Sequence, residues 1–338
     1  MSVVTLANAK QFSCAADVTL LDAARAQGLV LEHSCRTGRC GACKAKVLTG
    51  NTQAIKEEEA LSDEEKAANY IFTCCRAAIE DVELDIEDLG LLGAIPIQTL
   101  PCKIDSLIKL APDVLQLFLR LPPKNNFVYL AGQYIDVIAK NGVRRSYSIA
   151  NALPVNSVGE NQNAPHKVEL HVREVSDGAM SHYWFNEAKA NDLLRLEGPL
   201  GTFCFHEKAQ QNIIFLATGT GIAPIKSMLE YLDTSQTQTH SKNIYVYWGG
   251  RTPNDIYWQP IFANLNVHFH PILSQANEHW EGRRGYVQHA LLADNIDISD
   301  SVVYACGSDK MIHAAKDLLM AYGLNPKNFF SDAFVSSK

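Results

Sequence analysis

The sequence predicts a multidomain protein that combines α+β and α/β folds, and three observations lead to this prediction. The chain has 338 residues, which is too long for one ordinary hydrophobic core. Short strand-like runs separated by turn residues fill its middle part, and apolar strands alternate with helical segments in its last third. The first third holds a group of closely spaced cysteines. We therefore expect three domains, at residues 1–92, 99–207 and 208–338.

Composition and charge limit the classes of protein to consider. The chain is 47% hydrophobic and 20% charged, which is ordinary for a soluble protein. It has no apolar signal core in positions 1–20 and no stretch near the about 18 apolar residues of a membrane span, so we expect a cytoplasmic location and no membrane contact. Residues 1–92 hold 9 Lys and Arg against 15 Asp and Glu. This acidic part either steers a basic partner protein or only keeps the domain soluble, and nothing indicates nucleic-acid binding.

The first 92 residues have the pattern of a small α+β domain. A hairpin is expected around Ala7–Asn8, and the capping box Ser62-x-x-Glu65 opens a short acidic helix. The other expected elements are a helix over 20–27 that stops at Gly28, a strand over 44–48 and a strand over 81–88. Residues 89–98 have no clear period and contain two glycines and a proline, so we expect a linker there.

Cysteines at 35, 40 and 43 form the pattern CxxxxCxxC, and a fourth cysteine follows at Cys74 or Cys75. This spacing is that of the ligands of a plant-type [2Fe–2S] cluster. Gly38 and Gly41 permit backbone angles that a β-carbon would obstruct. A disulfide or a zinc loop is the alternative, but structural zinc sites usually use CxxC pairs and the chain has no second such pair.

The order of strands, helices and cysteines in this part resembles the β-grasp fold of plant-type ferredoxins. That resemblance implies that Cys35, Cys40 and Cys43 are cluster ligands. In ferredoxin-like sequences the last ligand stands seven residues before the acidic residue that begins the final strand. Here Asp81 is that residue, so the resemblance implies Cys74 as the fourth ligand. Cys75, which would point the opposite way in an extended segment, remains the alternative.

The middle part shows dense strand signals over 102–108, 114–121 and 134–139, separated by turn residues, which favour a small antiparallel barrel. Within it, Arg145-Ser146-Tyr147-Ser148 matches the RxYS motif, and the sequence resembles the flavin-binding part of the ferredoxin–NADP reductase superfamily. That resemblance implies a six-stranded barrel that binds FAD. The motif offers a cation for a phosphate, an aromatic ring for the isoalloxazine and the Ser148 hydroxyl near the redox nitrogen.

Two further motifs extend the resemblance to this superfamily. His171, Val172 and Arg173 match its cofactor-binding strand, and Gly178-x-x-Ser181 matches its phosphate-binding turn. A glycine that opens a helix leaves backbone N–H groups available to a diphosphate.

The last third alternates strands and helices and predicts a parallel sheet. An apolar strand from residue 213 runs into Thr218, Gly219, Thr220 and Gly221 and then into a helix, which resembles the GTGxAP nucleotide loop of the same superfamily. The expected elements that follow are strands over 244–248, 267–273 and 302–305 and helices over 256–265, 287–293 and 311–322.

The resemblance also implies roles for residues near the end of the sequence. Cys306 and Gly307 end a strand and are expected near the nicotinamide, with a small buried thiol as the alternative for Cys306. An aromatic residue close to the C-terminus is expected to cover the flavin, and we assign Phe334, with Phe330 as the alternative. Ser148, Cys306 and Phe334 are thus the expected catalytic residues.

Preference between the coenzymes depends on the segment 249–257. Arg251 could bind the 2′-phosphate of NADPH, whereas Asp255 would repel it and accept hydrogen bonds from a free ribose. We therefore predict a preference for NADH, with NADPH tolerated.

Taken together, the motifs resemble those of iron–sulfur flavoprotein reductases. Within that class the segments 71–75, 130–136, 144–152, 303–308 and 329–335 are similar to the CDP-6-deoxyhexulose-3-dehydrase reductase family, also called CDP-6-deoxy-Δ3,4-glucoseen reductases. The resemblance implies electron flow from NADH through FAD and the cluster to a pyridoxamine-phosphate dehydrase in 3,6-dideoxyhexose biosynthesis. The alternative partner is a ring-hydroxylating or similar oxygenase component. We expect a monomer.

Overall fold

The computed structural model describes residues 1–338 except 91, 93–94, 154–166, 236–241 and 335–338. Within the described chain two compact units are present. The first contains Met1–Pro96 together with two segments from later in the sequence, Gly201–Phe203 and Asp332–Lys338. The second contains Ile97–Leu200 and Cys204–Ser331, which are most of the residues assigned from sequence to two domains. No helix among the described residues is long and apolar enough to cross a membrane.

The first unit is built on a mixed five-stranded sheet with the strand order β2-β1-β7-β3-β5, and β4 and β6 form a separate antiparallel pair. β1 pairs antiparallel with β2 and parallel with β7, so the first and last strands of the unit lie side by side. The elements of this unit are β1 (Ser2–Leu6), β2 (Gln11–Cys14), α1 (Leu20–Ala26), β3 (Lys44–Thr49), β4 (Thr52–Ala54), α2 (Asp63–Ala67), β5 (Tyr70–Phe72), β6 (Arg76–Ala78) and β7 (Val82–Leu84).

Local sequence explains the two helices of this unit. Thr19 caps α1 by accepting a hydrogen bond from the backbone N–H of Asp22, and the helix buries Leu20 and Leu21. The predicted capping box of α2 is confirmed, because the Ser62 hydroxyl accepts from the Glu65 N–H and the Glu65 carboxylate accepts from the Ser62 N–H. The predicted opening hairpin is also confirmed by the pairing of β1 with β2.

The second unit begins with a six-stranded antiparallel sheet in the order β11-β10-β13-β8-β9-β12. Its two end strands approach each other at an isolated antiparallel bridge between Ile149 and Leu170. Alternate residues along these strands are fully buried and form one hydrophobic core. The elements are β8 (Gln98–Ala111), β9 (Val114–Arg120), β10 (Tyr134–Ile138), β11 (Arg144–Ser148), β12 (Lys167–Arg173), α3 (Ala179–His182), the π-helix η3 (Tyr183–Glu187) and β13 (Leu193–Leu200).

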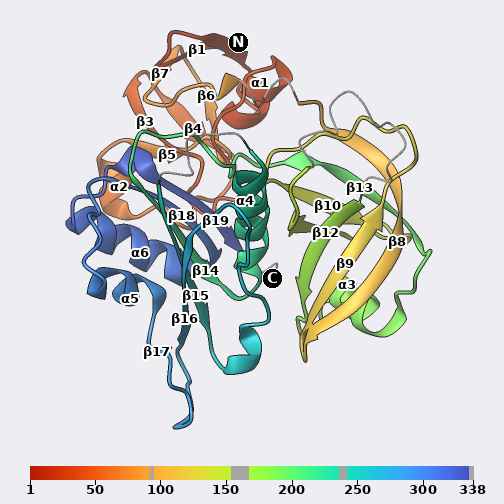
Figure 1. Cartoon of the computed structure of the whole chain (residues 1–338). Coiled ribbons are helices and arrows are strands. Elements are labelled where there is room, and N and C mark those ends of the chain that lie inside the picture. The colour runs from red at the N-terminus through yellow and green to blue at the C-terminus, as the bar shows by residue number, and fades with distance from the viewer. Residues whose placement is uncertain (91, 93–94, 154–166, 236–241, 335–338) are drawn as a thin grey trace. The chain divides into compact units, whose positions relative to one another are not determined.

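A second six-stranded sheet follows, in the order β17-β16-β15-β14-β18-β19. β14 pairs parallel with both β15 and β18, as the alternation of strands and helices predicts. Figure 1 shows α4 on one face of this sheet and α5 and α6 on the other. The elements are β14 (Asn212–Thr218), η4 (Gly219–Gly221), α4 (Ile222–Thr234), β15 (Asn243–Gly250), η6 (Pro253–Asp255), β16 (Val267–Leu273), β17 (Arg283–Arg284), α5 (Val287–Ala293), β18 (Ser301–Ser308), α6 (Asp309–Ala321), η7 (Pro326–Asn328) and β19 (Phe329–Phe334).

The prediction of a helix over 256–265 is wrong. The structure has only the short 3₁₀ turn η6 (Pro253–Asp255), closed by a capping box between Thr252 and Asp255, followed by a segment without regular secondary structure. Pro260 explains part of this result, because it lacks the N–H that a helix interior needs and its ring clashes with the preceding turn. The predicted strand over 267–273 coincides with β16 at both ends.

Candidate functional site

The cysteines of the CxxxxCxxC pattern lie in the loop between α1 and β3, and Cys74 and Cys75 follow β5. Their sulfur atoms form two pairs. The Sγ atoms of Cys43 and Cys74 are 3.2 Å apart, and the thiols of Cys35 and Cys40 are hydrogen-bonded to each other. None of the nine cysteines, all of which lie in described parts of the chain, is in a disulfide.

Two pairs of thiols fit a cluster of two irons, since each iron of a [2Fe–2S] cluster takes two protein thiolates. A single ion needs a different arrangement, and the described residues contain no group of three or more His, Cys, Asp or Glu side chains that converges on one metal position. Cys75 is turned elsewhere: its thiol donates to the carbonyl of Glu57 at 3.3 Å, although its Sγ is still 3.5 Å from that of Cys74.

The glycines of the cysteine loop are required by its backbone. Gly38 and Gly41 have φ angles of 78° and 73°, in the left-handed region that favours glycine. A Cβ on Gly38 would lie 2.1 Å from the carbonyl oxygen of Glu57 and 2.9 Å from the Sγ of Cys75. The predicted reason for these glycines is therefore confirmed, and the loop keeps the close backbone approach that a buried cluster needs.

The RxYS residues Arg145, Ser146, Tyr147 and Ser148 lie on β11. The Tyr147 hydroxyl accepts a hydrogen bond from the Trp184 indole at 2.9 Å, which joins β11 to the π-helix η3. Burial raises the pKa of Tyr147 to about 12, so its phenol is neutral at physiological pH. Arg145 donates to the backbone carbonyl of Arg144, and among the described residues it has no carboxylate partner. Its guanidinium is thus available to an anion.

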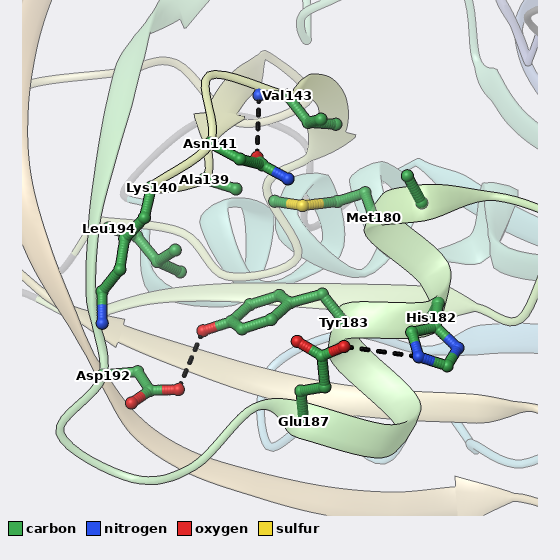
Figure 2. A pocket seen from close by; sticks show the side chains of 11 residues that line it. Ala139, Lys140, Asn141, Val143, Met180, His182, Tyr183, Glu187, Asp192 and Leu194 are labelled. Atoms are coloured by element: carbon green, nitrogen blue, oxygen red, sulfur yellow. Dashed lines mark hydrogen bonds and ion pairs between the residues drawn. The ribbon is translucent and has the colours of Figure 1, made fainter.

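A cavity of about 610 Å³ lies between the loop that precedes the RxYS strand and the helix that follows Gly178 (Figure 2). One wall is the loop 139–143 that leads into β11, and another is α3 with the start of η3, which follow Gly178. The Tyr183 hydroxyl donates to Asp192 at 3.0 Å within the lining. The segment before RxYS and the helix after Gly178 thus line one cavity.

Gly178 begins α3, as predicted, and contributes no side-chain cap to it. A Cβ there would lie 3.2 Å from the Cβ of Ser181. The Ser181 hydroxyl accepts a hydrogen bond from the Val175 N–H at 2.7 Å, so it closes the turn that precedes the helix. The first backbone N–H groups of α3 remain without a side-chain cap, which fits a phosphate.

Of the three residues predicted on the cofactor-binding strand, Val172 faces the hydrophobic core of the six-stranded antiparallel sheet. His171 and Arg173 point to the opposite face of β12. His171 is buried, with Nε2 3.0 Å from Glu169 and Nδ1 3.3 Å from the Tyr257 hydroxyl. Its ring nitrogens therefore have partners within the chain.

The nucleotide loop and the Cys306–Gly307 turn are packed against each other. A Cβ on Gly221 would lie 2.2 Å from the Cys306 carbonyl oxygen, and one on Gly307 would lie 2.2 Å from the Thr218 hydroxyl. That hydroxyl accepts from the Ser308 N–H at 2.9 Å. α4 begins directly after Gly219, Thr220 and Gly221 and has no side-chain cap, so its first N–H groups are available to a phosphate.

Asp255 has hydrogen-bond partners within the chain that the sequence did not indicate. One carboxylate oxygen accepts from Arg173 at 2.6 Å, and the other accepts from the backbone N–H groups of Arg251 and Thr252 at 3.0 Å. Burial by itself raises the pKa of Asp255, but these hydrogen bonds outweigh it and lower the pKa below its usual value. The carboxylate is thus ionised and holds the turn, while Arg251 is exposed.

The two aromatic candidates of the C-terminal strand differ in their surroundings. Phe330 stacks on both His206 and Tyr304, with ring centroids 4.6 Å and 5.2 Å away. Phe334, at the end of β19, is 40% exposed. Phe330 thus already has aromatic partners within the chain, and these contacts favour Phe334 as the residue that covers the flavin.

Several residues of functional interest were missed in the sequence. The described structure adds Lys226, Trp248 and Tyr257 to the surroundings of β12, and Thr202 and Asp332 to those of the cysteine loop. One signal was available: Glu169, His171 and Arg173 are polar at alternate positions of an otherwise apolar strand, which indicates a face that meets other polar groups. Thr202 and Asp332 carry no comparable local signal.

Comparisons with known families agree with this geometry. Residues 4–80 match the 2Fe-2S iron-sulfur cluster binding domain, residues 101–205 the oxidoreductase FAD-binding domain, and residues 215–317 the oxidoreductase NAD-binding domain. The chain therefore belongs to the iron–sulfur flavoprotein reductases of the ferredoxin–NADP reductase superfamily. It is an oxidoreductase with binding domains for a [2Fe–2S] cluster, FAD and NAD.

Individual relatives align over nearly the whole chain. The CDP-6-deoxy-L-threo-D-glycero-4-hexulose-3-dehydrase reductase of Yersinia pestis is 44% identical over 95% of this chain and 94% of its own. Protein RfbI of Salmonella typhimurium is 39% identical over 97% and 94%. Reductase component 1 of the terephthalate 1,2-dioxygenase of a Comamonas species is 31% identical over 96% and 95%.

Solved structures share the fold of this chain. The cytochrome P450 reductase GcoB of Amycolatopsis matches with a TM-score of 0.74 and 25% identity over 99% of both chains. The ferredoxin reductase of carbazole 1,9a-dioxygenase matches with a TM-score of 0.68 and 23% identity, over 99% of this chain and 98% of its own. The second of these similarities concerns the fold only.

Proposed function

We propose that this reductase passes electrons from NADH, through FAD and the [2Fe–2S] cluster, to a pyridoxamine-phosphate dehydrase that acts on a CDP-6-deoxyhexose. The observation that carries the proposal is the 44% identity over 95% of the chain to a reductase named for such a dehydrase. The product would be a precursor of 3,6-dideoxyhexoses for surface polysaccharide. We further propose a cytoplasmic monomer with the domains 1–92, 99–207 and 208–338, a β-grasp first domain and a barrel-shaped flavin domain.

The residues present fit all three groups. Cys35, Cys40, Cys43 and Cys74 would hold the cluster, because their sulfurs form two pairs. FAD would be held by the β11 residues and the uncapped start of α3, with part of it in the adjoining cavity. The nicotinamide nucleotide would be held by the uncapped start of α4.

A bound flavin supplies the step between a two-electron donor and a one-electron acceptor, since it accepts a hydride from NADH and gives electrons singly to the cluster. The protein residues provide orientation and charge. Arg145 would bind a flavin phosphate, the Tyr147 ring would lie on the isoalloxazine, and Ser148 would contact its redox nitrogen. Cys306 and Gly307 would border the nicotinamide, and Phe334 would cover the flavin until the nicotinamide arrives.

A second candidate partner is an oxygenase component. The 31% identity to a terephthalate dioxygenase reductase over 96% of the chain supports it. Both candidates use the same proposed site residues, so the site does not distinguish them. The higher identity to the dehydrase reductase favours the first.

Two measurements test this proposal. The purified holoprotein should reduce ferricyanide with NADH, and it should support NADH-dependent C-3 deoxygenation of the CDP-sugar when the dehydrase is added. A cluster-free sample should keep the ferricyanide activity and lose the coupled reaction, because the flavin residues lie outside the cysteine loop. Failure with ferricyanide would refute the reductase assignment. Activity with an oxygenase component but not with the dehydrase would support the second candidate instead.

A further inference from the structure

One face of β12 (Lys167–Arg173) carries polar side chains, among them those of Glu169, His171 and Arg173. Residues at alternate positions of a strand share a face, so all three point the same way, opposite to the hydrophobic core of the antiparallel sheet. Each of them contacts the part of the second unit that contains the nucleotide loop. β12 belongs to the antiparallel sheet that carries RxYS. Its polar face therefore connects that sheet to the part of the second unit that carries the nucleotide loop.

The first contact is a buried ion pair. Lys226 Nζ, on α4, donates to Glu169 at 2.8 Å, to Glu230 at 2.5 Å and to the carbonyl of Ala150 at 3.2 Å. All three ammonium donors thus have an acceptor, which a buried charge needs. Glu169 also accepts from Gln116 at 2.6 Å. Burial raises the pKa of Glu169, but its hydrogen bonds and the charge of Lys226 outweigh it and bring the pKa to about 2.

The second contact runs from the ion pair to the nucleotide loop. Because the ionised Glu169 only accepts, His171 Nε2 donates to it, and Nδ1 on the other side of the ring is hydrogen-bonded to the Tyr257 hydroxyl. The Tyr257 ring meets Trp248 edge to face, with centroids 5.0 Å apart. The Trp248 indole donates to the carbonyl of Gly219 at 2.9 Å. A continuous series of contacts therefore leads from Glu169 to Gly219.

The third contact reaches the same glycine from another direction. Arg173 donates to Asp255 at 2.6 Å, and Asp255 orders the backbone of Arg251 and Thr252. A Cβ on Gly219 would lie 3.7 Å from the Arg173 guanidinium, so this group lies beside the loop. Gly219, with φ 55°, thus accepts a hydrogen bond from the first series of side chains and lies beside the second.

We propose that Glu169, His171 and Arg173 are positioning residues. They hold the nucleotide loop 219–221 at the position relative to the RxYS-bearing sheet that hydride transfer requires. The inference rests on the reductase function proposed above. Hydride transfer depends on near-attack geometry, and a displacement of about 1 Å can cost about 100-fold in rate. The coenzyme would still bind to a displaced loop, because its phosphate contacts move with the loop. Glu169, His171 and Arg173, here called the positioning face, thus affect the rate of hydride transfer more than the affinity for NADH.

The test is Tyr257→Phe, which removes one hydroxyl and keeps the ring that meets Trp248. In anaerobic stopped-flow experiments with the holoprotein, we expect the rate of flavin reduction at saturating NADH to fall about tenfold, with little change in the Kd of NADH. The control is Tyr245→Phe, because Tyr245 stacks on His268 in the same sheet at 5.0 Å and lies outside the positioning face. Photoreduced flavin should be reoxidised by ferricyanide at the same rate in all three proteins.

A second pair of variants gives an independent measurement. Lys226→Gln should slow flavin reduction by NADH, and Lys226→Arg, which keeps the charge, should restore most of the rate. Unchanged reduction rates in Tyr257→Phe and Lys226→Gln, or an effect confined to Kd, would overturn the inference while leaving the reductase function intact. If NADH fails to reduce the wild-type flavin at all, the proposed function fails, and the inference fails with it.

Discussion

The hydroxyl of Ser34 donates a hydrogen bond to the carboxylate of Asp332, a residue 298 positions later in the chain. Both side chains are buried, and Ser34 directly precedes Cys35 of the cysteine loop. Thr202 binds the neighbouring residue from another segment: its hydroxyl accepts from the His33 N–H and donates to the His33 carbonyl, both at 2.9 Å. Two late segments of the sequence thus anchor the start of the proposed cluster loop.

The first prediction concerns the pH dependence of this contact. Burial raises the pKa of Asp332 from 3.8 to about 6, although the hydrogen bond from Ser34 acts in the opposite direction. The folded state therefore favours the protonated acid, and the stability that this provides is complete below about pH 3.8 and is lost as the pH rises through about 6. Asp332→Asn should remove this loss and stabilise the protein at pH 8 by up to about 3 kcal/mol.

Denaturant unfolding at several pH values between 4 and 8 measures this effect. The difference between variant and wild type should grow up to about pH 6 and then stay constant. Asp63→Asn is the control, because its side chain is fully exposed and the substitution should change little at any pH. A difference that is independent of pH would contradict the assigned pKa.

The second prediction concerns the cluster ligands. Cys74→Ser should abolish or severely weaken the visible and EPR signals of the [2Fe–2S] cluster, because the Cys74 sulfur is 3.2 Å from that of Cys43. Cys75→Ser should spare these signals and the iron content, because the Cys75 thiol donates a hydrogen bond to the Glu57 carbonyl. FAD should stay bound in both variants. The reverse pattern would make Cys75 the ligand.

The third prediction concerns the flavin. Acid extraction should release FAD, and Arg145→Ala should weaken its binding by on the order of 2 kcal/mol, or about 30-fold in Kd, through loss of a charge-assisted phosphate contact. The neighbouring Arg144→Ala is a matched control, because the Arg144 guanidinium is paired with Asp136 and Glu197. Equal loss of FAD in both variants, or release of FMN alone, would refute the assignment.

The fourth prediction concerns the coenzyme. We expect kcat/KM to be higher with NADH than with NADPH by a modest margin, because the segment 249–257 offers a 2′-phosphate a single cation, Arg251, rather than a clamp of several. Asp255→Asn separates two explanations for this preference. If Asp255 acts by ordering its turn, kcat/KM should fall with both coenzymes alike. A selective gain with NADPH would show instead that its charge repels the 2′-phosphate.

Local chemistry made much of the fold predictable. The Ser62 capping box is explained by a residue three positions away, and the capping box, the strand of residues 267–273 and the need for glycine at position 38 are each confirmed. The prediction of a helix over 256–265 was wrong for two reasons. It gave the side-chain periodicity more weight than Pro260, and it could not include the hydrogen bond between Tyr257 and His171, which no local pattern reveals.

The site was less predictable, because its side chains have distant partners. His171 and Asp255 were assigned to cofactors from motif positions, yet their hydrogen bonds go to residues between 80 and 90 positions away as well as to close neighbours. A motif fixes which residue types occur together and not which face of a strand they occupy. The cofactor roles of RxYS and the nucleotide loop remain predictions.

The anchoring of the cysteine loop by Thr202 and Asp332 has a consequence for biosynthesis. A polypeptide leaves the ribosome from its N-terminus, so the cysteines at 35, 40 and 43 emerge long before residue 332. The buried partner of Ser34 is missing throughout that interval. Any cluster insertion into the nascent chain would therefore act on a cysteine loop that lacks the hydrogen bond between Ser34 and Asp332. The folded surroundings of the cluster would be complete only after nearly the whole sequence has been translated.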